Sequence, residues 1–173
     1  MEVQWLALMR QKLNEALKAI KQKGVKVQMI QGEDSLTVIV DLVSLTKKMR
    51  EEAKQMLIQK MRASPFTLHF RKINGVEVVT SKATGVMTPE DEKRLRELET
   101  QYPNILTWKY DEKKHQLTVV IVLTEFYKRG LEEIINRVKQ ELAQGIAMMS
   151  MAGVELEYEI KVEDNLIIRV YKV

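Results

Sequence analysis

A pattern of one helix followed by two short alternating strands recurs four times in the 173 residues. Helices with apolar residues at helical spacing begin near Met1, Ser44, Thr88 and Thr124. The strand pairs that follow them are Val25–Ile30 with Leu36–Val43, Phe66–Arg71 with Val76–Ser81, Ile105–Tyr110 with Leu117–Leu123, and Val154–Val162 with Leu166–Val173. Internal repetition at a period of about 40 residues is typical of repeat architectures. It constrains the shape of the chain and implies no particular reaction.

Each expected strand alternates apolar with polar residues. In the second pair, Phe66, Leu68 and Phe70 form one apolar set with Val76 and Val78. Side chains of a strand point alternately to its two faces, so such a set marks a sheet with one buried and one wet face. We therefore expect antiparallel hairpins with the helices packed on one side.

Two helix ends carry recognisable signals. The first helix spans Val3–Lys23 and is followed by Gly24, a residue suited to the left-handed position after a helix. The third helix opens with Thr88 as its N-cap, then Pro89 and two acidic residues that face the positive end of the helix dipole. This helix has few apolar residues, so we expect it to be the most exposed.

These elements predict an α+β fold of four αββ units. The connections divide the chain into two pseudo-twofold αββαββ halves, residues 1–82 and 88–173, within a single domain of residues 1–173. One curved eight-stranded antiparallel sheet with four helices packed on one face satisfies the pattern.

Composition limits the classes of function. Both signs of charge are interspersed, and 28 basic against 24 acidic residues give a net charge of +4, which favours a solvated surface over a nucleic-acid footprint. The absence of cysteine excludes disulfides and thiolate chemistry. Apolar runs fall far short of the ~20 residues that span a bilayer. Without a signal-peptide pattern at the N-terminus, we expect a cytoplasmic protein that does not enter membranes.

Catalytic motifs are missing from the sequence. His69 lies on a wet strand face and His115 lies beside a turn, and neither has metal-ligand spacing. Glu155, Glu157 and Glu159 place three carboxylates on one strand face, a pattern more typical of a solvated edge than of a cation site. We expect no enzyme activity, no catalytic residue, no metal and no cofactor.

The ten methionines allow two interpretations. Methionine fills irregular gaps in a core, and it also lines adaptable apolar cavities that accept ligands. The stretch from Gly145 to Ala152 combines small residues with Met148, Met149 and Met151, where a helix that only fills a core would favour Leu and Ile. This clustering favours a ligand cavity.

The repeated αββ unit, the charged helix start from Thr88 to Leu95, the compact charged turns and the lack of cysteine together resemble computationally designed pseudocyclic proteins. In that family, diversified repeats surround a central pocket shaped for a small molecule. The resemblance covers the whole chain in style and architecture. It implies a designed protein that binds a rigid apolar or amphipathic ligand, such as a sterol-like acid.

Two hypotheses of function follow. The first is non-catalytic binding of a small apolar or amphipathic, sterol-like ligand by a monomer, in a pocket between helices and sheet lined by Trp5, Met9, Met56, Phe70, Trp108, Tyr110, Met148 and Met149. The alternative is a structural scaffold or a nucleic-acid or protein interaction domain. It would use the polar sheet face, where five basic residues could meet phosphates: Lys26, Arg71, Lys109, Arg169 and Lys172.

Overall fold

The computed structural model describes residues 2–62 and 67–173, and in these ranges the chain has an α+β fold. The helices are α1 (Glu2–Ala16), α2 (Lys18–Gln22), α3 (Leu42–Arg62), α4 (Pro89–Gln101) and α5 (Leu123–Met151). The strands are β1 (Val27–Gln31), β2 (Ser35–Asp41), β3 (Thr67–Ile73), β4 (Val76–Thr84), β5 (Leu106–Asp111), β6 (Gln116–Val122), β7 (Leu156–Val162) and β8 (Asn165–Lys172). The expected helix start at Met1 and strand start at Phe66 lie outside the described residues.

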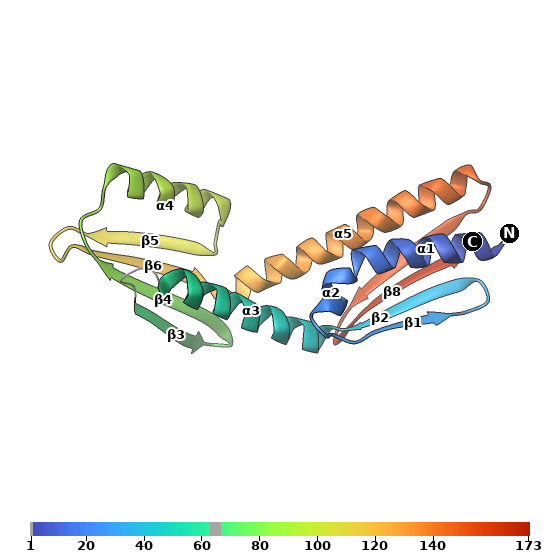
Figure 1. Cartoon of the computed structure of the whole chain (residues 1–173), viewed down its shortest axis with the longest axis horizontal. Helices are drawn as coiled ribbons and strands as arrows, with labels where there is room; N and C mark the ends of the chain where they lie inside the picture. Colours follow the sequence, from blue (N-terminus) through green and yellow to red (C-terminus); the bar gives the residue numbers. More distant parts are fainter. Residues whose placement is uncertain (1, 63–66) are drawn as a thin grey trace. The chain divides into compact units, whose positions relative to one another are not determined.

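The described strands form two antiparallel sheets of four strands each. One sheet has the order β1-β2-β8-β7, and the other has the order β3-β4-β6-β5 (Figure 1). The expectation of a single curved eight-stranded sheet is therefore not confirmed. In each sheet two hairpins join through their second strands, β2 with β8 and β4 with β6. These central strands bury the apolar residues of one face.

The chain divides into two compact units. Unit 1 comprises Met1–Lys48 and Leu131–Val173, and unit 2 comprises Met49–Gly130. Helices α3 and α5 each contribute residues to both units. The first hairpin thus pairs with the fourth and the second with the third, whereas the expected halves, 1–82 and 88–173, would group the first with the second and the third with the fourth. In unit 1, every second residue is buried over most of β2 and β8, so their pairing joins two apolar strand faces.

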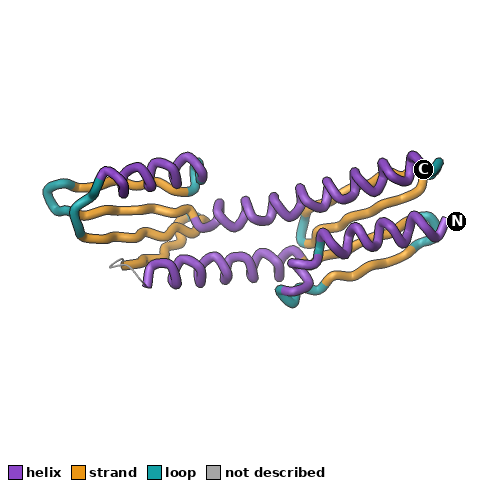
Figure 2. Tube along the Cα trace, turned by 45° about the horizontal axis from the view of Figure 1, so that its top comes forward, coloured by secondary structure: helices purple, strands orange, loops and turns teal. Residues whose placement is uncertain are grey.

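In unit 1, α1 and the C-terminal part of α5 lie side by side on the same face of the sheet (Figure 2). The Nζ of Lys12 lies 3.6 Å from the Oε2 of Glu141 across these two helices. Beneath them lies the core of unit 1, whose buried side chains include Trp5, Met9, Leu13, Leu17, Ile20, Leu36, Val38, Val40, Leu45, Val138, Leu142, Leu156, Leu166, Ile168 and Val170.

The first expected helix is divided in two by one residue. Leu17 has φ −101° and ψ 4°, outside regular helical geometry, although its N–H still donates to the Leu13 carbonyl at 2.9 Å. Five helices therefore replace the four expected in the described part of the chain. Gly24 adopts φ +78°, which confirms the expected left-handed residue after this helix.

In unit 2, α4 covers the β5 side of the sheet (Figure 1). Buried side chains from α3, the sheet and the start of α5 form one apolar cluster: Ala53, Leu57, Val79, Ile105, Leu106, Val119, Ile121 and Leu123. Leu95 and Leu98 of α4 are only partly buried against it, and α4 has no fully buried residue. The expectation that this helix is the most exposed agrees with that burial.

In unit 2, the face of β4 that points into the core is the opposite of the one expected. Val76 and Val78 were expected to point into the core, but the buried residues of β4 are Glu77, Val79 and Ser81. Polar side chains thus replace valine on the core face of this strand. Asn74 and Gly75 make the preceding turn with φ of 50° and 80°, the two positive values of a tight hairpin turn.

Candidate functional site

Four of the eight residues expected to line a ligand pocket belong to unit 1, and three of these are packed into its core. Trp5 is 1% exposed, Met9 is fully buried and Met149 is also buried, whereas the neighbouring Met148 is 52% exposed. A Cβ placed on Gly145 would lie 2.6 Å from the Sδ of Met9. The glycine of the Gly145–Ala152 stretch therefore allows close packing of α5 on α1.

The other four residues belong to unit 2 and occupy different surroundings. Met56 is half-buried on α3, and Phe70 is exposed on the edge strand β3, with the Nζ of Lys54 5.5 Å from its ring centroid. Trp108 packs against the apolar cluster, and its buried Nε1 has no hydrogen-bond partner among the described residues. Tyr110 lines a hollow in the surface. For all eight residues, contact with a ligand stays a prediction.

The hollow beside Tyr110 has a volume of about 420 Å³ and lies wholly within unit 2. Three segments enclose it: the end of β4 with the connection that follows, the first turns of α4, and the β5–β6 hairpin. Its lining residues are Ala83, Thr84, Gly85, Val86, Met87, Asp91, Arg94, Leu95, Tyr110 and Leu117. Most of the exposed lining is apolar, and the charged groups come from α4.

Hydrogen bonds hold one wall of this hollow in place. The Tyr110 hydroxyl donates to the Gly85 carbonyl at 2.7 Å, and the Gly85 N–H donates to the His115 carbonyl at 2.8 Å. The Nδ1 of His115 lies 3.3 Å from the Tyr110 hydroxyl oxygen. Because the hydroxyl proton is directed to Gly85, we assign a proton to Nδ1, which then donates to the hydroxyl. The connection after β4 is thus tied to the β5–β6 hairpin.

Asp91 forms part of the N-terminal cap of α4. Its N–H donates to the Thr88 hydroxyl at 3.2 Å, and its carboxylate accepts the Thr88 N–H at 3.2 Å, which completes a capping box. The backbone and side-chain hydrogen bonds of Thr88 lower the pKa of Asp91, and the charge of Arg94 acts in the same direction. Asp91 therefore stays ionised near neutral pH.

Arg94 is the cation at this hollow. It is exposed, and within the described part of the chain it forms no hydrogen bond or ion pair. Val86, on the opposite connection, is 79% exposed. The apolar part of a ligand could therefore contact the lining while an anionic group of the same ligand binds Arg94.

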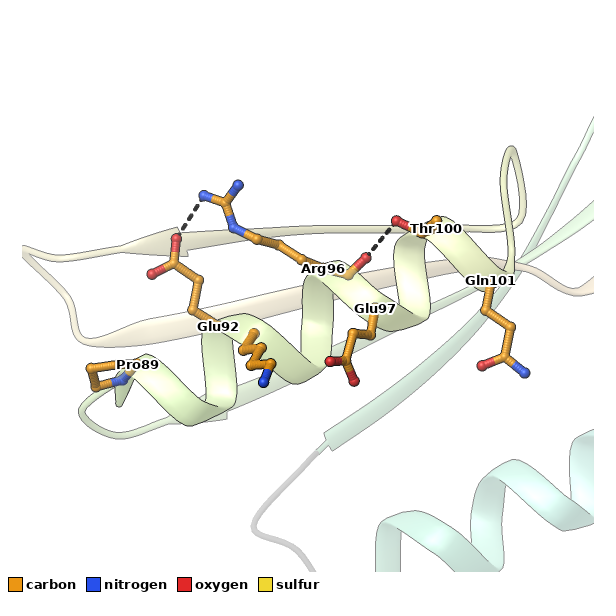
Figure 3. Close-up of a pocket in the computed structure, with 7 residues that line it drawn as sticks. Pro89, Glu92, Arg96, Glu97, Thr100 and Gln101 are labelled. Atoms are coloured by element: carbon orange, nitrogen blue, oxygen red, sulfur yellow. Dashed lines mark hydrogen bonds and ion pairs between the residues drawn. The ribbon is translucent and has the colours of Figure 1, made fainter.

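Two larger hollows lie on the outer faces of helices and, unlike the hollow beside Tyr110, are not enclosed by several segments. One of about 690 Å³ is lined by residues of α4 alone, where Arg96 and Glu92 form an ion pair of 2.8 Å and the Thr100 hydroxyl donates to the Arg96 carbonyl (Figure 3). Another, of about 560 Å³, is lined by the outer face of α1 and by Lys18. A convex helix face cannot surround a ligand, so neither is a better candidate than the 420 Å³ hollow.

No family model, curated protein or solved structure matches this chain. Within residues 2–62 and 67–173, no group of three or more His, Cys, Asp or Glu is placed to hold a metal ion. None of the described helices is both long enough and apolar enough to cross a membrane. The site therefore has to be interpreted from its own geometry.

Sequence reasoning missed most of the residues around the hollow. Arg94, Leu95, Met87 and His115 were not expected to act together. The signal that could have found them is the hairpin turn at Asp111–Lys114, because its register places Tyr110 opposite Leu117 and next to His115. The preceding segment Ala83–Met87 stood out only as an irregular connection.

Proposed function

We propose that this protein binds a small amphipathic molecule without catalysis, in the 420 Å³ hollow of unit 2. The observation that carries the proposal is an apolar hollow enclosed by three segments, with a single cation, Arg94, that forms no hydrogen bond or ion pair within the described residues. Small-molecule sites are mostly apolar concavities of about 300–1,000 Å³ with a few polar groups that fix orientation. The hollow falls in that class.

The chemistry of the lining suggests a rigid apolar body with one anionic group. Met87, Leu95 and Leu117 offer apolar contacts, and the guanidinium of Arg94 suits a carboxylate. Asp91 at the same rim disfavours a second anion. A sterol-like acid meets these conditions. The designed pseudocyclic origin and the fourfold αββ repeat stay predictions beside this proposal.

The test uses cholate, a sterol acid, and its uncharged methyl ester. Binding is followed by methyl chemical shifts of Leu95 and Leu117 in the full chain. We expect saturable binding of both compounds, with the acid bound more tightly. Arg94→Gln should weaken cholate binding about tenfold, which corresponds to the loss of one charged hydrogen bond, and should leave the ester unchanged.

A matched control lies two residues away on the same helix. Arg96 also belongs to α4 but lines its outer face and pairs with Glu92. Arg96→Gln changes the net charge equally and should leave cholate binding as it is. No saturable shift with either compound, or equal losses in the two variants, would reject the proposal.

A further inference from the structure

The second sheet face of unit 2 points away from its core and is open. Alternation along β3, β4, β5 and β6 places on this face Thr67, His69, Arg71, Ile73, Val76, Val78, Thr80, Lys82, Thr84, Thr107, Lys109, Asp111, Gln116, Thr118, Val120 and Val122. None of these residues is buried. We refer to this set as the open face of unit 2.

Five aliphatic residues form a continuous patch at one end of the open face. Ile73 is paired with Val76, and Val78 is paired with Val122. Val120 lies two residues from Val122 on β6, so the patch crosses three neighbouring strands. Ile73 is 54% exposed. A cluster of aliphatic side chains on a wet face indicates a surface for another molecule more than a set of isolated exposed residues does.

The remainder of the open face is polar and includes three cations. Lys82 and Lys109 are both paired with Thr118 from opposite sides, so two strand spacings, about 10 Å, separate their Cα atoms. Arg71 is paired with Val78 and so borders the aliphatic patch. Within the described part of the chain, none of these three cations forms a hydrogen bond or an ion pair.

Among the described residues, the acidic residue of the open face, Asp111, forms no ion pair with these cations. The carboxylate of Asp111 accepts the N–H groups of Lys113 at 3.0 Å and Lys114 at 3.3 Å in the hairpin turn. The corresponding face of unit 1 is different. There Arg169 lies 3.4 Å from Glu159 and stacks on the Tyr171 ring at 4.7 Å. The open face of unit 2 therefore presents three cations and one carboxylate, a net positive charge, beside aliphatic surface.

We propose that the open face of unit 2 binds an acidic amphipathic segment of a partner protein. Aliphatic residues of that segment would cover the patch around Val78 and Val122, and its carboxylates would meet Lys82, Lys109 and Arg71. Nucleic acid fits less well, because the described residues of the face include no Phe, Tyr or Trp on which bases could stack. A symmetric pair of copies joined through this face would bring like charges together.

The test measures fluorescence anisotropy of a labelled 18-residue helical peptide with the full chain. Its polar face is glutamate and its apolar face is leucine. One comparison peptide has lysine in place of glutamate, and another has the same composition with the leucines scattered. A 20-base-pair DNA duplex is the fourth probe. We expect saturable binding of the acidic amphipathic peptide alone.

Two double variants and one control separate the two parts of the face. Lys82→Glu with Lys109→Glu should weaken binding at least tenfold at low salt and reduce its salt dependence. Val78→Thr with Val122→Thr should weaken binding at every salt concentration and leave the salt dependence unchanged. Threonine keeps β-branching, so this variant should keep the strands intact, which circular dichroism checks. Lys113→Glu with Lys114→Glu makes the same charge change in the turn and should bind as wild type does.

Several outcomes would overturn the proposal. They are the absence of binding, equal binding of the lysine or scattered peptide, and equal weakening by the turn control. DNA binding that the Lys82 and Lys109 changes abolish would assign the face to nucleic acid. Concentration-dependent self-association that the valine changes abolish would assign it to a second copy of the chain.

Discussion

The Nε of Arg50 on α3 lies 2.5 Å from the Oε1 of Glu77, which occupies the core face of β4. The side chain of Glu77 is 11% exposed, and that of Arg50 is 34% exposed. The Glu77 N–H donates to the Thr124 hydroxyl at 2.8 Å. Helix α3 and the start of α5 thus both contact Glu77 of β4, α3 through the carboxylate and α5 through the backbone N–H. The hydrogen bond that Arg50 donates to Glu77 raises the pKa of Arg50 above its ordinary value, so Arg50 stays charged at every working pH.

Replacing Arg50 should lower the free energy of unfolding more than removing the charge of Glu77 does. Breaking a fully buried ion pair costs about 3–5 kcal/mol of stability. We expect a smaller cost here, because about a third of the Arg50 side chain is exposed to solvent. We expect Arg50→Met to lower the free energy of unfolding of unit 2 by about 2–4 kcal/mol, because it leaves Glu77 unpaired. Glu77→Gln should cost about 1–2 kcal/mol, because Arg50 can turn to water. Urea unfolding followed by amide exchange in β4 and β6 measures both values, and the reverse order would show that the pair is not held as described.

Two glycines of α5 should respond differently to alanine. A Cβ at Gly145 would lie 2.6 Å from the Sδ of Met9, whereas a Cβ at Gly130 would lie 2.8 Å from the terminal Cε of Met49. Met9 is fully buried, so moving its side chain would disturb its core neighbours, whereas Met49 is half-exposed and can turn toward solvent. Alanine gains about 1 kcal/mol of helix propensity, and overpacking costs about 1–3 kcal/mol. Gly130→Ala should therefore raise the midpoint of thermal unfolding and Gly145→Ala should lower it. Equal shifts would contradict the close approach at Gly145.

Periodicity was sufficient to predict the elements of this fold and insufficient to predict how its hairpins pair. The alternation of Leu36, Val38 and Val40 locates β2 and its buried face, because every second residue is apolar. On β4, alternation predicted the wrong buried face. Val76 to Val79 offers apolar residues in both phases, and the ion pair with Arg50 draws Glu77 inward. Such a pair depends on a helix distant in the sequence.

The candidate site was predictable only in part for a similar reason. Tyr110 follows from strand alternation, but its hydroxyl meets Gly85, which lies 25 residues earlier in an irregular connection. The methionine pattern does not show which residues each side chain contacts. The side chain of Met9 packs against a glycine of α5, and the spacing of residues in the sequence cannot show such a neighbour.

Tyr171 of β8 should titrate at unusually high pH. Its hydroxyl donates to the Oε2 of Glu157 at 3.0 Å, and this hydrogen bond raises the pKa of Tyr171 above its ordinary value of 10.0. A raised pKa in the folded state stabilises the fold below pH 10, and the contribution disappears as the pH rises through the folded-state value. Glu157→Gln should bring the pKa of Tyr171 down toward 10, as measured by the Cζ chemical shift. Glu163→Gln, an acid in the β7–β8 turn, is the control and should leave it unchanged.

Acid should loosen the first turn of α4 before it unfolds unit 2. The bonds with Thr88 lower the pKa of Asp91 below its ordinary value of 3.8. A lowered pKa in the folded state stabilises the helix above pH 3.8, and this contribution is lost as the pH falls through the folded-state value. The protection factor of the Thr88 amide against exchange should fall in that range in the wild type. In Asp91→Asn the protection factor should already be lower at pH 7 and should change little with acid, whereas Glu90→Gln keeps the capping box and should behave as the wild type does. An acid response of Thr88 that persists in Asp91→Asn would mean that another carboxylate controls this helix end.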